Sequence, residues 1–447
     1  MDERVKDFLA GRDANNLDAL DLPVSLAGSI EWNDLAETKP RIVGGMLRNL
    51  ALRTRRDVPF YRDHPLWKDI PLYDIEGIAD LTSLPLISKD DIPGTGSPTT
   101  EGIHGFRAAL LANKRLLVPE NLDQIIARQE AANPDHEEIL AWYGGRRVLE
   151  FSSGGTKGTG TITSLSYLTV EMEAHALARA LRMNGFRSEE SIACFYNDTH
   201  KGGLQLERAA EIMGMPFHSK SQIFRTLAQD QRYGDAIRGF QERCARQDFI
   251  GANEQYGETV REGIREYIRG NEIQIVESVQ PPVCILGKNA KGAGLAFMDI
   301  YLGDPSAFDS VNHVFLTGSY IPQWAYERLQ QDGQTVSTTW GASEVMALAT
   351  HASRMGRNVN DLVATPFPTI GSVVRYKERG RERPQLERVN EEEMGLVLVT
   401  GVSGAGSTYI NYQIGDLGTR TRGGYSEIRR TENADITGSC ASDALGI

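Results

Sequence analysis

The sequence predicts an α/β protein with a mostly parallel sheet flanked by helices, followed by a small, mostly antiparallel β subdomain. Between residues 165 and 340, segments with helical periodicity alternate with short apolar runs, as expected when helices cover a parallel sheet. After residue 370 the alternation stops, and two strand-like runs follow one another without a long helix between them. The expected domains are therefore residues 1–370 and residues 371–447.

Each expected element has a local pattern. Helices are expected at 41–56, where apolar residues form one stripe, near 121–132, and after the glycine-rich stretch, where Val170, Ala174, Leu177 and Leu181 are spaced by four, three and four. Further helices are expected at 204–213, 231–246 and 257–269. Strands are expected at 147–150, 191–196, 248–251, 272–277, 312–317, 335–339, 371–376 and 396–400.

Composition restricts the class of protein. The chain has 447 residues, enough for two or three packed lobes, and a net charge of −12, which argues against a nucleic-acid or membrane-surface partner. Its four cysteines are far apart and form no Cys-x-x-Cys pair, so neither a disulfide scaffold nor a cysteine zinc site is expected. The N-terminus has no apolar signal-peptide core, and a cytoplasmic location is expected.

The stretch 151–161 combines small hydroxyl residues, glycines and one lysine. Ser152, Ser153, Gly154, Gly155, Thr156 and Lys157 offer backbone and hydroxyl donors and a cation, as a polyphosphate requires. A flexible surface loop is the alternative. The spacing matches neither a Walker loop nor a dinucleotide fingerprint, because Thr163 stands where the latter needs its third glycine.

Three later clusters could complete a nucleotide site. An apolar run ends in Gly318-Ser319, another in Trp340-Gly341 with Ser343-Glu344 after it, and Asp416 stands between two glycines. Alone, each is also typical of a turn, a core position or a solvated charge. Together with the phosphate-type stretch, they would provide a surface for a purine, a magnesium ligand and an acceptor for ribose hydroxyls, which describes an ATP site.

In these segments the sequence resembles the adenylate-forming (acyl-AMP) superfamily, and within it the phenylacetate-CoA ligase branch. Residues 152–159 are similar to its Ser-Ser-Gly-Thr-Thr-Gly-Lys-Pro loop, 340–344 to its aromatic-Gly-x-Thr/Ser-Glu motif, 318–322 to its Gly-Gly-Ala-x-Leu turn and 412–417 to its Tyr-Arg-Thr-Gly-Asp-Leu motif. The branch is indicated by residues 58–62, 84–91 and 201–204. Lys157 and Gly158 are in swapped order, and Gln413 replaces the usual arginine.

The resemblance implies an adenylation core in residues 1–370 that uses ATP and Mg²⁺ to convert an organic, aromatic acid into an acyl-adenylate. Ser152 to Lys157 would hold the phosphates, with Thr156 and Lys157 catalytic. Gly318 and Ser319 would line the adenine pocket, Trp340 with Gly341 and Ser343 would adjoin the base, Glu344 would be catalytic and bind magnesium, and Asp416 would accept the ribose hydroxyls. Tyr196, Gly202 and Gly203 would border the acyl pocket.

The family's C-terminal lid, with its late lysine, is expected to be absent. The residues after Gly418 contain no lysine, and Arg430 is the nearest hinge-like cation, expected at the ATP site. The acyl group could pass to CoA or another thiol, or to Cys440 as in the acyl-protein synthetases that resemble this branch. A non-catalytic protein with this fold is a further alternative, and a homodimer is left open.

Overall fold

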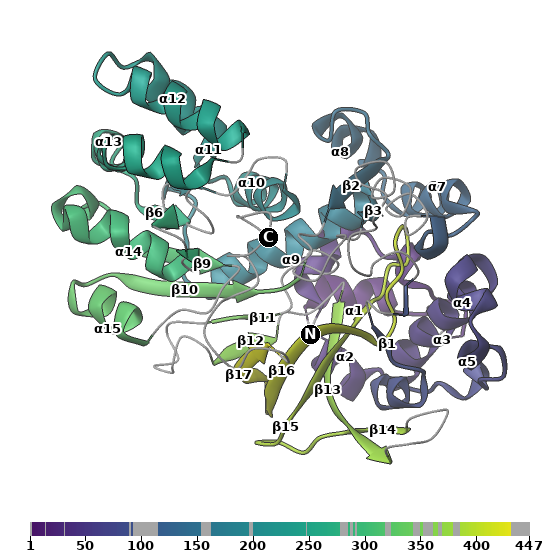
Figure 1. Ribbon diagram of the computed structural model, residues 1–447. Helices are drawn as coiled ribbons and strands as arrows, with labels where there is room; N and C mark the ends of the chain where they lie inside the picture. Colours follow the sequence, from purple (N-terminus) through teal and green to yellow (C-terminus); the bar gives the residue numbers. More distant parts are fainter. Residues whose placement is uncertain are drawn as a thin grey trace. The chain divides into compact units, whose positions relative to one another are not determined.

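The computed structural model describes residues 2–13, 15–30, 32–88, 91–92, 115–152, 162–195, 200–246, 248–277, 285–286, 289–290, 293–317, 323–342, 349–351, 361–364, 369–378 and 385–430 (Figure 1). The chain forms two compact units. The first comprises Met1–Arg179, Gly341–Ala349 and Ala364–Glu432, and the second Ala180–Trp340, Thr350–Val363 and Asn433–Ile447. The expected domain boundary at residue 370 stays a prediction.

The first unit contains an antiparallel sheet with the strand order β14-β13-β15-β16-β17. Its strands are β13 (Thr369–Glu378), β14 (Gln385–Arg388), β15 (Met394–Gly401), β16 (Tyr412–Thr421) and β17 (Gly424–Arg430). The short strand β1 (Ile87–Ser88) pairs with β16 in parallel. The expected strands 371–376 and 396–400 lie inside β13 and β15, so the antiparallel region is confirmed.

The helices of this unit come from the N-terminal part of the chain. They are α1 (Glu3–Leu9), α2 (Trp32–Thr38), α3 (Pro40–Asp57), α4 (Pro59–Asp63), α5 (Pro65–Lys68), α7 (Leu122–Ala132), α8 (His136–Trp142) and α9 (Tyr167–Met183), which runs into the second unit. Short 3₁₀ helices are η1 (Ala19–Asp21), η2 (Val24–Ser29), η3 (Leu72–Asp74) and η4 (Ile78–Ser83).

Helix α3 shows how the sequence sets these elements. Pro40 occupies its first turn, where the missing N–H costs nothing, and the helix ends just before Pro59, whose ring disfavours helical geometry in the preceding residue. Its predicted apolar stripe is buried, with Val43, Met46, Leu47 and Leu50 all at most 2% exposed. The expected helices at 41–56 and 121–132 are confirmed as α3 and α7.

Tyr61 in α4 links the N-terminal helices to the segment before β16. Its hydroxyl donates to Thr408 O and accepts from Ile410 N, both at 3.0 Å, and the side chain is fully buried. We expect Tyr61→Phe to lower the free energy of unfolding by about 2 kcal/mol, because a buried N–H and a buried carbonyl lose their partner. Urea denaturation measures this. Tyr73→Phe, at a tyrosine 71% exposed, is the control, and equal losses would contradict the role of Tyr61.

The second unit contains a parallel sheet with the strand order β10-β9-β6-β4-β5. These strands are β4 (Ile192–Cys194), β5 (Phe217–His218), β6 (Ile275–Glu277), β9 (His313–Thr317) and β10 (Thr335–Trp340). Shorter strands are β7 (Ile285–Leu286), β8 (Asn289–Ala290), β11 (Ala349–Thr350) and β12 (Leu362–Ala364). The helices are α10 (Lys201–Met213), α11 (Lys220–Gln229), α12 (Gly234–Ala245), α13 (Phe249–Gly270), α14 (Ala293–Gly303) and α15 (Gln323–Gln331), with η7 (Pro305–Phe308).

The core of this unit lies between the sheet and helices α11 to α15 (Figure 1). Val314 and Leu316 of β9 point into this core, whereas Phe315 between them packs against Phe186, with ring centroids 5.7 Å apart. Because alternate residues of a strand face opposite sides, apolar side chains cover both faces. This explains the continuous apolar runs, and the predicted α/β class with a mostly parallel sheet is confirmed.

One predicted strand is wrong. Residues 248–251 were expected to form a strand, but 249–251 begin α13, which continues through the helix expected at 257–269. The Asp248 side chain accepts a hydrogen bond from Gly251 N and caps the helix. A short apolar run does not by itself distinguish a strand from a buried helix start, and the burial of Ala252 against the core decides for the helix.

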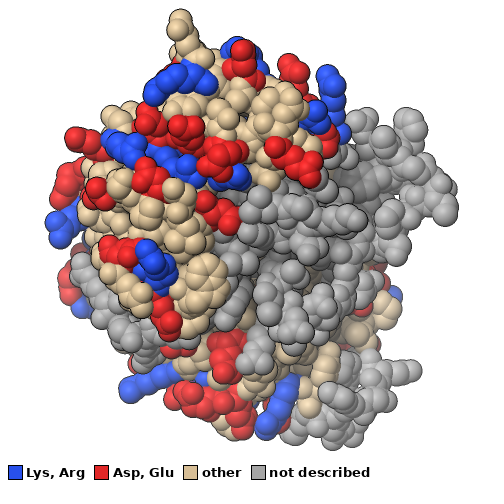
Figure 2. Space-filling view, turned by 60° about the vertical axis from the view of Figure 1, so that its left-hand side comes forward, with Lys and Arg blue, Asp and Glu red and all other residues tan. Residues whose placement is uncertain are grey.

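Acidic and basic side chains are interspersed on the face shown in Figure 2. Ion pairs on the described surface of the second unit include Arg232 with Glu266 at 3.1 Å and Arg269 with Asp304 at 2.6 Å. Neither sign forms a continuous field over the described residues of this face. No described helix combines the length and apolarity that crossing a membrane requires.

Candidate functional site

The glycine-rich stretch is enclosed by two paired strands. Strand β2 (Val148–Ser152) and strand β3 (Ile162–Ser166) are antiparallel, and their register places Ser152 opposite Ile162. The structure therefore brings the two ends of segment 153–161 together in a β-hairpin. Candidates Ser153, Gly154, Gly155, Thr156 and Lys157 lie outside the described residues. The sequence interpretation missed β3, since it placed the helix directly after the loop.

Strand β3 is fixed from its other side by residues that occur more than 230 positions later. Ser164 N donates to Ser407 Oγ, and Ser166 N donates to Ala405 O, each at 2.9 Å. Gly406 approaches β3 so closely, with φ of +134°, that a Cβ there would lie 2.1 Å from Ser164 O. A turn of residues 403–407, which we call the serine-glycine turn, thus acts as a support for the hairpin.

The same region leads into the strand that carries Asp416. Thr163 Oγ1 and Tyr409 OH are 3.1 Å apart, and the ring centroids of Tyr409 and Tyr412 are 4.9 Å apart. Tyr412 begins β16, in which Asp416 is 6% exposed and stands opposite Arg430 in the register with β17. Within the first unit, the hairpin, Asp416 and the backbone of Arg430 are therefore connected through one continuous set of contacts.

The strands that precede two further candidate segments, β9 and β10, end at the same edge of the parallel sheet of the second unit. Strands β9 and β10 are parallel neighbours, with Thr317 opposite Thr339. Gly318 and Ser319 follow the first strand, and Trp340, half-buried, ends the second and precedes Gly341. The carboxyl edge of a parallel sheet is where such folds bind ligands. Gly318, Ser319, Ser343 and Glu344 lie outside the described residues.

The acyl-pocket candidates belong to the first turn of α10 and to the sequence just before it. Gly202 and Gly203 are buried in its first turn, whereas Tyr196 lies outside the described residues. His200 caps the helix, with its Nδ1 accepting a hydrogen bond from Gly202 N at 3.1 Å. Burial, reinforced by the charge of Lys201, lowers the pKa of His200 from 6.5 to about 4. The cap is therefore a neutral imidazole at neutral pH.

This pKa shift predicts a pH dependence of stability. The folded chain resists protonation of His200 while the unfolded chain accepts a proton near pH 6.5, so the stabilisation is complete above that pH and is lost between pH 6.5 and 4. We expect this one ring to account for a loss of about 2 kcal/mol, since it is only partly buried. His200→Asn keeps a capping acceptor without titrating, and urea denaturation of both proteins across this range isolates the effect. Parallel pH profiles would contradict it.

A buried carboxylate at the same sheet edge was missed by the sequence analysis. Glu277 ends β6 and is fully buried; its Oε1 accepts from Thr317 Oγ1 at 2.8 Å and its Oε2 from Cys194 Sγ at 3.2 Å. The only feature of the local sequence that could have indicated this site is a charged residue at the end of an apolar strand. No group of three or more potential metal-ligating side chains occurs among the described residues, and the metal candidate Glu344 lies outside them.

No protein-family model matches the sequence, and no curated protein matches it. Solved structures do match. They include 2-hydroxyisobutyryl-CoA ligase in the postadenylation state with R3-HIB-AMP, at a TM-score of 0.57 and 12% identity, covering 98% of this chain and 78% of that one. The same enzyme with 2-HIB-AMP matches at 0.56 and 12%, covering 92% and 72%. Its thioesterification state with 2-HIB-AMP and CoA matches at 0.55 and 14%, covering 95% and 72%.

The chain therefore shares the fold of these solved acyl-CoA ligase structures. The fold that the resemblance of the sequence motifs implies is confirmed by these matches. The phenylacetate-CoA ligase branch stays a prediction, as do the roles of the individual site residues and the absence of a lid.

Proposed function

We propose that the protein activates an organic carboxylic acid as an acyl-adenylate at the expense of ATP and passes the acyl group to a thiol, with CoA as the first candidate. The observation that carries the proposal is the shared fold with a ligase captured with acyl-AMP and with CoA. The order of the four motif segments along the chain supports it. An aromatic acid is the preferred substrate class, on the resemblance of residues 58–62, 84–91 and 201–204 to phenylacetate-CoA ligases.

The chemistry assigns separate tasks to these segments. A carboxylate oxygen attacks the α-phosphorus of ATP and pyrophosphate leaves; the thiol sulfur then attacks the acyl carbonyl and AMP leaves. Negative charge grows at phosphorus in the first step, and donors fixed before the reaction stabilise it best. The hairpin that carries residues 153–161 would provide such donors, because Ser152 and Ile162 are held opposite one another.

The nucleoside would be held by other residues of the chain. Asp416 is a buried carboxylate on β16 and would accept the two ribose hydroxyls. Trp340 at the end of β10, beside the segment that carries Gly318 and Ser319, would lie against the base. Glu344 has the oxygen ligand that Mg²⁺ prefers, and the ion would neutralise the phosphate charge. Gly202 and Gly203, which have no side chains, would leave room for the acyl group.

Pyrophosphate exchange tests the proposal. The protein is incubated with ATP, labelled pyrophosphate and Mg²⁺, and with one acid at a time from a panel of aryl, arylacetic, short 2-hydroxy and fatty acids. We expect acid-dependent formation of labelled ATP, strongest with an aromatic acid. Exchange with aliphatic acids only would support adenylation but contradict an aromatic substrate. No exchange with any acid would favour a non-catalytic protein with this fold.

A further inference from the structure

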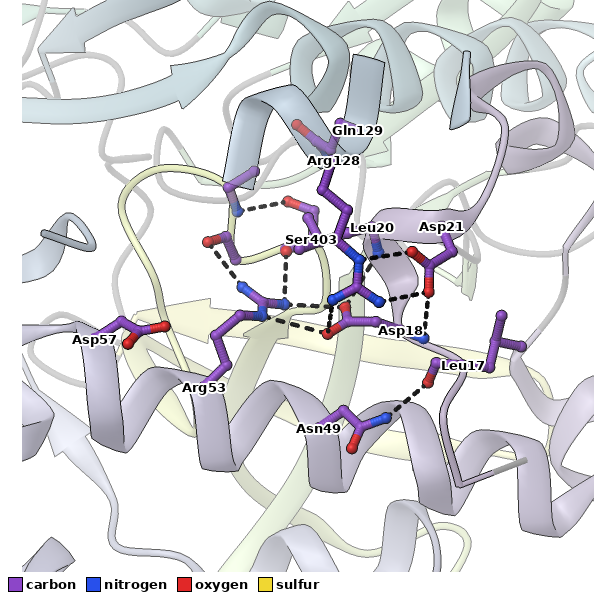
Figure 3. A network of polar contacts seen from close by, with 12 residues as sticks. Leu17, Asp18, Leu20, Asp21, Asn49, Arg53, Asp57, Arg128, Gln129 and Ser403 are labelled. Carbon is purple, nitrogen blue, oxygen red and sulfur yellow. Dashed lines mark hydrogen bonds and ion pairs between the residues drawn. The ribbon is translucent and has the colours of Figure 1, made fainter. Parts of the chain in front are cut away.

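A buried ion pair also contacts the serine-glycine turn (Figure 3). Arg53 of α3 donates from Nε and Nη2 to the carboxylate of Asp18, at 3.3 and 3.0 Å. It also donates from Nη1 to Gly404 O at 3.2 Å and from Nη2 to Ser403 O at 3.1 Å. One guanidinium therefore binds a carboxylate and two successive backbone carbonyls of the turn.

The geometry requires an arginine in this place. Its side chain is 8% exposed and that of Asp18 is 3% exposed, so both charges depend on protein partners. The planar guanidinium directs several N–H donors at fixed angles, which a lysine ammonium does not do. The contact is close: a Cβ at Gly404, where φ is +56°, would lie 2.8 Å from Arg53 Nη1.

The turn transmits this support to the hairpin through two routes. Directly, Ala405 O and Ser407 Oγ accept the backbone N–H groups of Ser166 and Ser164 in β3. A second route runs through hydroxyl groups: Ser403 Oγ and Thr169 Oγ1 are 3.0 Å apart, and Thr169 Oγ1 and Ser166 Oγ are 2.9 Å apart. Ser166 Oγ in turn donates to Gln129 Oε1 at 2.7 Å.

We propose that Arg53, held by Asp18, is a positioning residue that fixes the serine-glycine turn and, through it, strands β2 and β3 of the hairpin, and that this supports ATP binding. This inference rests on the proposed function. Arg53 belongs to neither the sequence motifs nor the hairpin, and it acts on the loop only through residues 403–407 and strand β3. We therefore expect replacement of Arg53 to weaken the binding of ATP and to leave the binding of the acid unchanged.

The network contains a matched control. Arg128 of α7 also pairs with aspartates: it donates from Nε and Nη2 to both oxygens of Asp21 at 2.7 Å, and its Nη1 lies 3.9 Å from Asp18 Oδ2 (Figure 3). Its side chain is 42% exposed. Arg128→Met thus removes a guanidinium from the same cluster and the same unit without removing a donor to Ser403 or Gly404.

The experiment compares Arg53→Met, Arg53→Lys and Arg128→Met with the unaltered full chain, at a temperature where all four are folded. Hydrogen exchange followed by mass spectrometry reports the protection of the Ser164 and Ser166 amides. Pyrophosphate exchange reports KM for ATP, KM for the acid and kcat. In both Arg53 variants we expect exchange at 162–168 to be about tenfold faster and KM for ATP at least about fivefold higher, with KM for the acid within about twofold. Arg128→Met should leave the exchange rate at 162–168 and both KM values near those of the unaltered chain.

Unchanged protection at 162–168 in Arg53→Met would overturn the proposal, as would faster exchange there with KM for ATP unchanged. A uniform loss of kcat with both KM values unchanged would mean that Arg53 only keeps the chain folded, and would also overturn it. If the unaltered chain shows no pyrophosphate exchange, the proposed function fails on its own. The amide protection would still decide whether Arg53 holds the hairpin.

Discussion

Replacing Gly406 with alanine is expected to lower the free energy of unfolding by at least about 3 kcal/mol. At φ of +134° an alanine is strained, and its Cβ would lie 2.1 Å from Ser164 O and 2.7 Å from Leu165 Cα. Both contacts are with backbone atoms, so no side-chain rotation can relieve them. Either the turn or strand β3 must move, and the hydrogen bonds between them must break. Urea denaturation followed by circular dichroism measures the loss.

Gly423→Ala is the control for this substitution. Gly423 lies between β16 and β17 in the same unit, and a Cβ built there meets nothing within 4 Å. We expect a change within about 0.5 kcal/mol. If Gly406→Ala were as stable as Gly423→Ala, the close approach of the serine-glycine turn to β3 would be wrong, and the proposed support of the hairpin would be wrong with it.

The second large effect concerns activity. If Glu344 binds magnesium as proposed, Glu344→Gln is expected to reduce Mg²⁺-dependent pyrophosphate exchange by at least about 100-fold, because the amide keeps the shape of the side chain and removes its negative charge. The melting temperature should stay near that of the unaltered protein, since this is a change of one charge. The measurement is exchange rate against Mg²⁺ concentration, with thermal denaturation run in parallel.

Glu327→Gln is the matched control for charge. Glu327 lies on the exposed face of α15 and accepts a hydrogen bond from Gln323 Nε2 at 3.0 Å. The Glu327→Gln variant should exchange pyrophosphate at the rate of the unaltered protein. Activity retained in Glu344→Gln would refute the magnesium role of Glu344 while leaving adenylation itself open, because another residue would then have to hold the ion.

Much of the fold could be predicted from local patterns. The stripe of Val43, Met46, Leu47 and Leu50 and the apolar run that ends at Thr317 reflect burial on one face or on both, so periodicity alone identifies α3 and β9. Strand β3 could not be found in this way. Ile162–Ser166 is rich in hydroxyl groups, which suggests a loop, and its extended form depends on pairing with β2 and on hydrogen bonds to residues 405–407.

The residues of the candidate site also fall into two groups, those that local sequence motifs predict and those that only tertiary contacts reveal. Motif order predicts the segments that carry Thr156, Trp340 and Asp416 as parts of a site, but it says nothing of Arg53, whose partners are 35 residues before it and about 350 residues after it. The sequence around Glu277 likewise gives no sign of Thr317 and Cys194, because those contacts arise from neighbouring parallel strands. Residues that act by holding others in place are recognised from tertiary contacts.

The wide sequence separation between β3 and the serine-glycine turn has a consequence for biosynthesis. The hydroxyl-rich strand is made first, and the acceptors of its N–H groups, Ala405 O and Ser407 Oγ, are translated more than 230 residues later. Since domains fold as the chain emerges, the hairpin must wait until residues 405–407 have been made before it acquires these neighbours. A ribosome that stalls before codon 403 would therefore release a chain with its glycine-rich hairpin unsupported, a substrate for chaperones and proteases.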